Sequence, residues 1–219
     1  MKARFLIVTL IFSSCTVLFP ETFVRKPAHF NLEKLWFNIQ LDYNKTASYL
    51  INTTQTDYNA KSNDEYSQQL VGFFTEKLRG NLFLKSDYKT ADNKIIIPFL
   101  IDYDLSKENI ELLKKATTLD YIILSKIVSI NKVNNATNTQ LAKLQYGQDV
   151  LAGSVVFLKV FDIKNNSILI EMRCQATITD VRNYNFNTNS YETDTRIATY
   201  MGNDQLLKRA FKKILKKIK

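Results

Sequence analysis

The strongest hydrophobic pattern in the chain lies between residues 154 and 181, where two apolar segments flank a short polar one. The first segment, from Val155 to Phe161, is almost wholly apolar, as expected for a strand covered on both faces. In the second segment every other residue is apolar: Ile168, Ile170, Met172, Cys174, Ala176 and Ile178. Between them, residues 162–167 are rich in Asp and Asn, which favour tight turns. The pattern predicts a long β-hairpin whose second arm has one face in water.

The amino-terminal half shows weaker periodicity. Residues 36–43 alternate between apolar and polar side chains and predict a half-buried strand. A polar loop is expected from there to about residue 61. A helix is then expected to begin at Asn63 or Asp64 and to end near Gly80, because glycine suits a helix carboxyl cap. Its apolar side would consist of Tyr66, Leu70, Phe73, Phe74 and Leu78.

Further along the chain, a short strand is expected at residues 82–88 and an extended segment at 95–101. Ser106 predicts the amino-terminal cap of a second helix, whose inward residues would be Ile110, Leu113 and Ala116. A mostly apolar strand follows at 120–128, and the polar residues 131–153 form a long connection to the hairpin.

The last helix is expected from about residue 203 to 218. Its apolar stripe consists of Leu207, Ala210, Phe211, Ile214, Leu215 and Ile218, and lysines and Arg209 occupy the opposite side. The simpler interpretation packs the stripe on a sheet and leaves the charges solvated. The alternatives are an interfacial helix attracted to anionic lipid, or a docking surface for an acidic partner.

Together these elements predict an α+β domain over residues 36–219. It would contain a mixed or antiparallel sheet of about five strands, with two or three helices packed on it, in the order β-α-β-α-β-β-β-α. The chain has 219 residues, of which 45% are hydrophobic, and this length and composition suit one globular domain with extensions.

The amino terminus has the parts of a secretory signal. Lys2 and Arg4 precede an apolar run that ends in Ser13, Ser14 and Cys15. This ending is similar to a bacterial lipobox, which implies a signal peptide at 1–14, lipid attachment at Cys15 and a tether at 15–35. Ordinary secretion and an uncleaved anchor are the alternatives.

The second cysteine, Cys174, falls on the apolar side of its predicted strand, where a thiol behaves as a small hydrophobe. A Cys15–Cys174 disulfide is the competing hypothesis for an oxidising compartment.

The positive charge is concentrated at the carboxyl end. The formal net charge is +9, but residues 204–219 contain seven basic residues and one acidic residue. Lys2 and Arg4 lie in the presumed signal, so the rest of the chain is close to neutral, at about +1. A nucleic-acid partner is not expected, because the body of the domain has no basic stripe.

Few residues suggest catalysis, and neither a cofactor nor a metal is expected. The one histidine, His29, lies in the predicted tether, and no phosphate-binding glycine loop or Cys/His metal spacing occurs. Asp102 and Asp104 flank Tyr103, and as alternate residues of a strand they would share a face that could bind a hard cation or do acid–base work. The simpler interpretation is that the pair ends a strand in solvent and leads into a helix cap. The two carboxylates support the alternative function, a carboxylate-dependent hydrolase of cell-wall or surface glycan.

Two groups of residues are candidates for binding. Tyr184, Phe186 and Tyr191 lie in a Tyr- and Asn-rich segment, and such residues suit adaptable recognition. Lys212, Lys213 and Lys216 lie on the basic side of the last helix.

Three segments carry a family resemblance: residues 119–124, residues 160–169 and the closing amphipathic helix. Their order resembles the α+β domain of the curli-secretion lipoprotein, the lipoprotein activators of penicillin-binding proteins, and the amino-terminal domain of the Tol translocation protein. The resemblance implies a non-enzymatic binding or assembly accessory on the outer membrane, facing the periplasm. Its expected partners are the membrane, through lipidated Cys15, envelope proteins or cell-wall polymer, and further copies of the chain.

Overall fold

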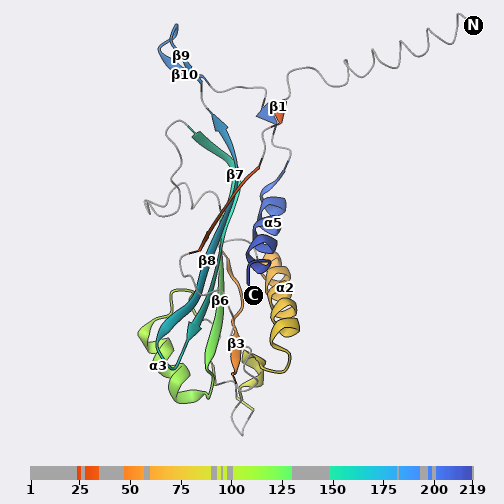
Figure 1. Cartoon of the computed structure of the whole chain (residues 1–219), viewed down its shortest axis with the longest axis vertical. Coiled ribbons are helices and arrows are strands. Elements are labelled where there is room, and N and C mark those ends of the chain that lie inside the picture. Colours follow the sequence, from red (N-terminus) through yellow and green to blue (C-terminus); the bar gives the residue numbers. More distant parts are fainter. Residues whose placement is uncertain are drawn as a thin grey trace, which may run out of the picture.

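The computed structural model describes residues 24–25, 28–34, 47–56, 60–89, 93–94, 96–97, 101–129, 148–181, 183–192, 197–198 and 201–218. These residues confirm the predicted α+β fold, with helices packed on a mixed seven-stranded sheet of order β2-β8-β7-β6-β3-β5, in which β4 also pairs with β6 (Figure 1). The strands are β2 His29–Lys34, β3 Tyr49–Ile51, β4 Gln55–Thr56, β5 Leu82–Leu84, β6 Tyr121–Ser129, β7 Gln148–Asp162 and β8 Ser167–Val181. The helices are α2 Ala60–Leu78, α3 Lys107–Ala116 and α5 Asn203–Leu215.

Two small sheets complete the described elements. Strand β1 (Val24–Arg25) pairs in parallel with β11 (Ile197–Ala198), and β9 (Asn183–Asn185) pairs antiparallel with β10 (Ser190–Glu192). A single turn of 3₁₀ helix, η1 (Lys85–Asp87), follows β5 in place of the longer strand predicted to residue 88.

The predicted hairpin is confirmed and is longer than the apolar pattern alone indicates. Strands β7 and β8 have fifteen residues each and pair along nearly their whole length. At the tip, the Asp162 carboxylate accepts a hydrogen bond from the Asn165 amide at 2.8 Å, and Asn166 has a left-handed φ of 53°. The hydrogen bond explains why an Asp begins the turn, because its carboxylate stabilises the turn backbone. The positive φ explains the Asn, because this residue tolerates the left-handed conformation.

One detail of the predicted alternation is wrong. Val160 pairs with Ile170 and Phe161 with Ile168, so Leu169 is an extra residue, as in a β-bulge. Because a one-residue shift reverses the faces of a strand, Ile168 packs with Phe161 on the face opposite Ile170.

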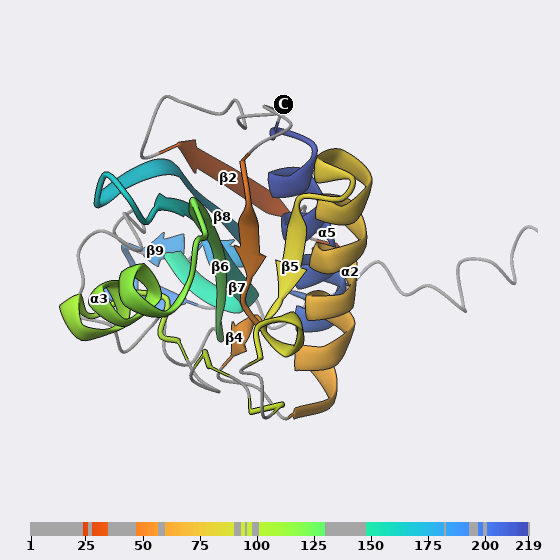
Figure 2. The same ribbon diagram turned by 90° about the horizontal axis from the view of Figure 1, so that it is seen from below.

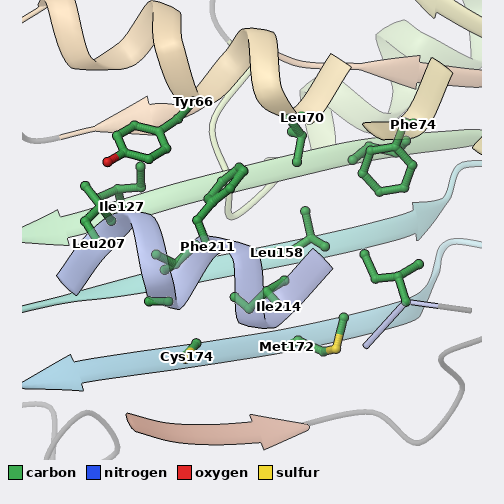
Figure 3. Packing of buried hydrophobic residues seen from close by; sticks show 14 of the residues in the cluster. Tyr66, Leu70, Phe74, Ile127, Leu158, Met172, Cys174, Leu207, Phe211 and Ile214 are labelled. Carbon is green, nitrogen blue, oxygen red and sulfur yellow. The ribbon is translucent and has the colours of Figure 1, made fainter. Parts of the chain in front are cut away.

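Helices α2 and α5 cover one face of the sheet, and α3 covers the other (Figure 2). The larger core lies under α2 and α5, as Figure 3 shows for side chains from both helices and from β6, β7 and β8. Phe211 of α5 lies 5.3 Å from the ring of Tyr66 of α2, which joins the two helices above the sheet. The predicted stripe of α5 is buried except for half-buried Leu215, and Leu206 is buried as well.

The smaller core lies between the sheet and α3. Ser106 caps α3 as predicted, because its hydroxyl accepts a hydrogen bond from the Asn109 amide at 3.2 Å. Ile110 and Leu113 are buried, and Ala116 is half-buried. Coverage on both faces explains the apolar composition of β6 and β7.

The predictions for the amino-terminal half need four corrections. Helix α2 begins at Ala60, before the expected start at Asn63 or Asp64. Residues 29–34 were expected in the tether but form β2, because Phe30 and Leu32 alternate with polar residues and pair with β8. Residues 49–51 were expected in a loop but form β3, which is fully buried and too short to show a period. At the end of α2, Arg79 and not Gly80 adopts the left-handed backbone, with φ of 47°. The predicted strand at 36–43 lies outside the described residues.

Candidate binding surfaces

The proposed lipid attachment residue, Cys15, lies outside the described residues, so lipidation stays a prediction. The other candidate residues fall on two separate parts of the molecule. Tyr184, Phe186 and Tyr191 belong to the β9–β10 hairpin, and Lys212, Lys213 and Lys216 lie on α5. Figure 1 shows the hairpin beyond one end of the sheet, with the carboxyl end of α5 well away from it. The structure therefore divides the predicted set into two surfaces.

The β9–β10 hairpin follows directly after β8 but forms a two-stranded sheet of its own. Tyr184 and Tyr191 are register partners across the two strands. The Asn185 side chain accepts a hydrogen bond from the Asn187 amide at 2.8 Å, which closes the start of the turn. Phe186 lies in this turn and is 87% exposed. The hairpin thus presents an aromatic side chain at its tip.

Helix α5 presents a second surface, which we call the basic face: Lys208, Arg209, Lys212, Lys213, Lys216 and Lys217. All six side chains are exposed, while the opposite side of the helix is buried in the larger core. The simpler interpretation of this helix is therefore confirmed for its apolar stripe. The lysines of the last turn also lie where the negative end of the helix dipole favours cations.

Within the part of the chain that the structure describes, neighbouring elements contact the basic face at its two edges. Lys208 forms an ion pair with Glu65 of α2 at 3.4 Å. On the other side, the Lys213 ammonium lies 3.5 Å from the carbonyl oxygen of Phe30 and 5.6 Å from the centre of its ring. The face therefore extends from α2 across α5 to the edge strand β2.

A buried charged group on the other face of the sheet was not predicted. Lys159 of β7 lies 3.6 Å from the carboxylate of Glu171 on β8, and both side chains are largely buried. The Lys159 ammonium also donates to the carbonyl oxygen of Tyr103 at 3.3 Å and lies 4.2 Å from the centre of its ring. The sequence feature that could have indicated this buried group is Lys159 itself, the one lysine in an otherwise apolar predicted strand.

This group holds the chain before α3 against the hairpin. The Tyr103 hydroxyl donates to Glu171 at 3.1 Å. Burial, and then the adjacent Glu171 carboxylate, raise the pKa of Tyr103 far above its usual range. The phenol therefore stays protonated at any physiological pH and serves as a hydrogen-bond donor.

The two carboxylates beside Tyr103 do not form a cleft. Asp102 is exposed, and Asp104 is in a turn with 83% of its side chain exposed. The Asp104 carboxylate lies 4.0 Å from the Lys126 ammonium, a weak surface ion pair. This geometry differs from the prediction that both residues share one face of a strand.

Cys174 is a buried free thiol in β8. Burial raises its pKa to about 11, although Lys213 opposes the change. At neutral pH the thiol is protonated, and it acts as an apolar side chain of the larger core, which Figure 3 shows next to Met172.

The described residues contain no cluster of three or more His, Cys, Asp or Glu side chains able to hold a metal ion. Among the helices in the same part of the chain, none has the length and apolar character needed to cross a bilayer.

Comparisons with known proteins found few similarities. No protein-family model and no curated protein matches the sequence. A solved PelC dodecamer from Paraburkholderia phytofirmans is similar in structure with a TM-score of 0.40 and 7% sequence identity, over 88% of this chain and 98% of that chain. A point variant of the same dodecamer gives a TM-score of 0.39 and 8% identity over the same shares. At these values the similarity does not support a transfer of function.

Proposed function

We propose that this protein is a lipid-anchored accessory protein of the bacterial cell envelope, on the outer membrane and facing the periplasm. It acts by binding another envelope component and catalyses no reaction. The observation that carries this proposal is Phe186, an aromatic side chain 87% exposed at the tip of a hairpin outside the main sheet.

The hairpin has the character of a recognition element held by a rigid scaffold. It continues from β8, which is paired with β7 on one side and with the edge strand β2 on the other. An exposed phenylalanine offers a large apolar contact with few rotatable bonds, so its ordering on binding costs little entropy. The lipobox-like sequence at Cys15 and the family resemblance favour the same class of protein.

The alternative function, a carboxylate-dependent hydrolase, requires two carboxyl groups that face a bound substrate. Asp102 and Asp104 are instead exposed at the turn before α3. Asp102→Asn/Asp104→Asn in purified protein tests this alternative directly, since hydrolysis of cell-wall glycan that depends on either residue would establish it.

Lipidation is tested by metabolic labelling with a palmitate analogue. The wild-type chain should carry the label and Cys15→Ala should not. Cys174→Ala is the matched control and should remain labelled, because Cys174 is buried in the core. Label that persists in Cys15→Ala contradicts the anchor.

Binding by the hairpin is tested with a photo-crosslinking phenylalanine analogue at position 186 in living cells. The matched control places the same analogue at Leu112, an exposed apolar residue of α3. We expect a discrete adduct with an envelope component only from position 186. An identical adduct pattern from both positions would refute the recognition role of the hairpin.

A further inference from the structure

We propose that the basic face of α5 docks on the headgroups of an anionic lipid bilayer. The proposal rests on the proposed function in one respect, the position of the lipid anchor. It concerns a different surface from the β9–β10 hairpin, and it assigns the second of the two surfaces a partner of its own.

The first argument is the distribution of charge over the helices on the two faces of the sheet. From Asn203 to Ile218, α5 and its last turn carry six basic residues and one acidic residue, Asp204. Helix α2, on the same face, carries two basic and three acidic residues, so the positive charge of this face is concentrated on α5. Helix α3, on the opposite face of the sheet, carries three basic and two acidic residues. The molecule therefore presents an attractive potential for anionic headgroups on one side.

The second argument is the composition of the basic face. Five of its six residues are lysines, and none of the large apolar side chains that are exposed in the described residues lies on α5. Protein interfaces are poor in lysine and depend on aromatic and arginine anchors. A lysine is a flexible, hydrated point charge that does not need a shaped partner, which suits a fluid bilayer surface better than an acidic protein.

The third argument is the path of the chain towards Cys15. Val24 pairs with Ile197 and Arg25 with Ala198, so the amino-terminal chain lies next to the segment that leads into α5. Cys15 precedes Val24 by nine residues. Nine residues span at most about 30 Å. The thirteen residues of α5 extend about 20 Å. The chain between Cys15 and Val24 is thus long enough for a lipid on Cys15 and the basic face to meet the same bilayer.

The test measures sedimentation of residues 15–219, the chain that remains after the predicted signal peptide, with vesicles. All proteins carry Cys15→Ala, so that a lipid does not contribute to vesicle binding. The result therefore tests docking of the basic face whether or not Cys15 is lipidated in the cell. The vesicles contain either phosphatidylcholine alone or phosphatidylcholine with phosphatidylglycerol. Lys212→Glu/Lys216→Glu reverses two charges of the basic face. Lys114→Glu/Lys115→Glu reverses two exposed charges of α3 and changes the net charge equally.

We expect the Cys15→Ala chain to prefer the phosphatidylglycerol vesicles and to lose this preference as salt increases. Reversal of Lys212 and Lys216 should weaken that binding at least about tenfold, whereas reversal on α3 should change it less than about twofold. Equal weakening by both pairs would overturn the proposal, and so would equal binding to the two kinds of vesicle. Binding of soluble polyglutamate with none to vesicles would also overturn it, in favour of an acidic protein partner. Thermal unfolding of each variant checks that the fold is intact.

Discussion

At the scale of single residues, Gly153 shows how closely the hairpin and α5 fit together. A Cβ at this position would lie 2.6 Å from the carbonyl oxygen of Ala176 and 2.8 Å from a methyl carbon of Thr177. The Gly153 amide donates to the Asn203 side chain at 2.7 Å, at the first residue of α5. The absence of a side chain therefore lets β7 approach β8 closely and also hold the start of α5.

We expect Gly153→Ala to lower the free energy of unfolding by about 1–3 kcal/mol, because the backbone of β8 must shift to relieve the clash. Gly72→Ala is the matched control. Its added methyl meets nothing within 4 Å in the exposed middle of α2. It should raise stability by up to about 1 kcal/mol, since alanine is the better helix former. Chemical denaturation of both variants measures the difference, and wild-type stability in Gly153→Ala would show that the contact relaxes freely.

Asp120 links three distant segments at the start of β6. Its carboxylate accepts hydrogen bonds from the Ser48 amide at 2.8 Å and the Ser48 hydroxyl at 2.9 Å, and it pairs with Lys164 of the hairpin tip. Partial burial alone would raise the pKa of Asp120. The hydrogen bonds from Lys164 and Ser48 outweigh burial and hold the pKa below its usual value.

Because the folded protein holds this proton less readily than the unfolded chain, the contribution of Asp120 is present above the unfolded pKa of about 3.9 and is lost as pH falls through the lower folded pKa. Asp120→Asn should therefore cost about 1 kcal/mol at pH 7 and progressively less in acid. Denaturant unfolding at several pH values measures this. Asp102→Asn, which removes an exposed carboxylate near α3, is the control and should change the free energy of unfolding little at any of these pH values. A pH-independent loss in Asp120→Asn would mean that its charge is not involved.

At the scale of elements, α5 combines two roles on opposite sides of one helix. Leu206, Leu207, Ala210, Phe211 and Ile214 are buried in the larger core. The spacing of these residues turns the lysines outwards, so that docking of the helix on the sheet necessarily presents the basic face to solvent. The helical spacing of the apolar residues in α5 thus determines both which side packs on the sheet and which side carries the exposed positive charge.

Phe211→Ala should lower the free energy of unfolding by about 3–5 kcal/mol, because it removes the ring that packs on Tyr66 and leaves a cavity under α5. Lys212→Ala, at the next position, should change stability by no more than about 0.5 kcal/mol, since its side chain is exposed. Unfolding in guanidinium chloride measures the free energy of unfolding of both variants. Similar losses in the two variants would contradict the orientation of the helix.

At the scale of the whole molecule, the central strands of the main sheet and the β9–β10 hairpin should differ in local stability. Strands β6, β7 and β8 form consecutive long pairs, and each has a neighbouring strand on both sides. The β9–β10 hairpin has only its own two short strands, and such a hairpin is at best marginally stable by itself.

Amide hydrogen exchange should therefore be slowest in the middle of β7, where exchange requires global unfolding, and fast in β9 and β10, where local opening suffices. Mass spectrometry of proteolytic fragments resolves these regions. Protection of the hairpin equal to that of β7 would indicate that another part of the protein covers it. A rise in hairpin protection when the crosslinking partner is added would independently support recognition there.

The sequence by itself determined the elements whose evidence is local. The apolar runs and alternation of β7 and β8, the Asp/Asn turn between them, the Ser106 cap and the stripe of α5 all depend on neighbours within a few residues, and all are present. The class of fold and the coverage of β7, the first arm of the hairpin, on both faces followed from the same patterns. The bulge at Leu169 did not.

Only the tertiary structure decided which distant segments meet. The pairing of β2 with β8 and of β3 with both β5 and β6 joins residues far apart in sequence. Strands β3 and β5 have three residues each, too few to show a period. Glu171 is the cross-strand partner of Lys159 within the hairpin, whereas the contacts of both residues with Tyr103 form only when the chain before α3 folds over the hairpin. The separation of the hairpin and the basic face into two surfaces has the same cause, since periodicity reports which side of an element is buried but not where that element lies.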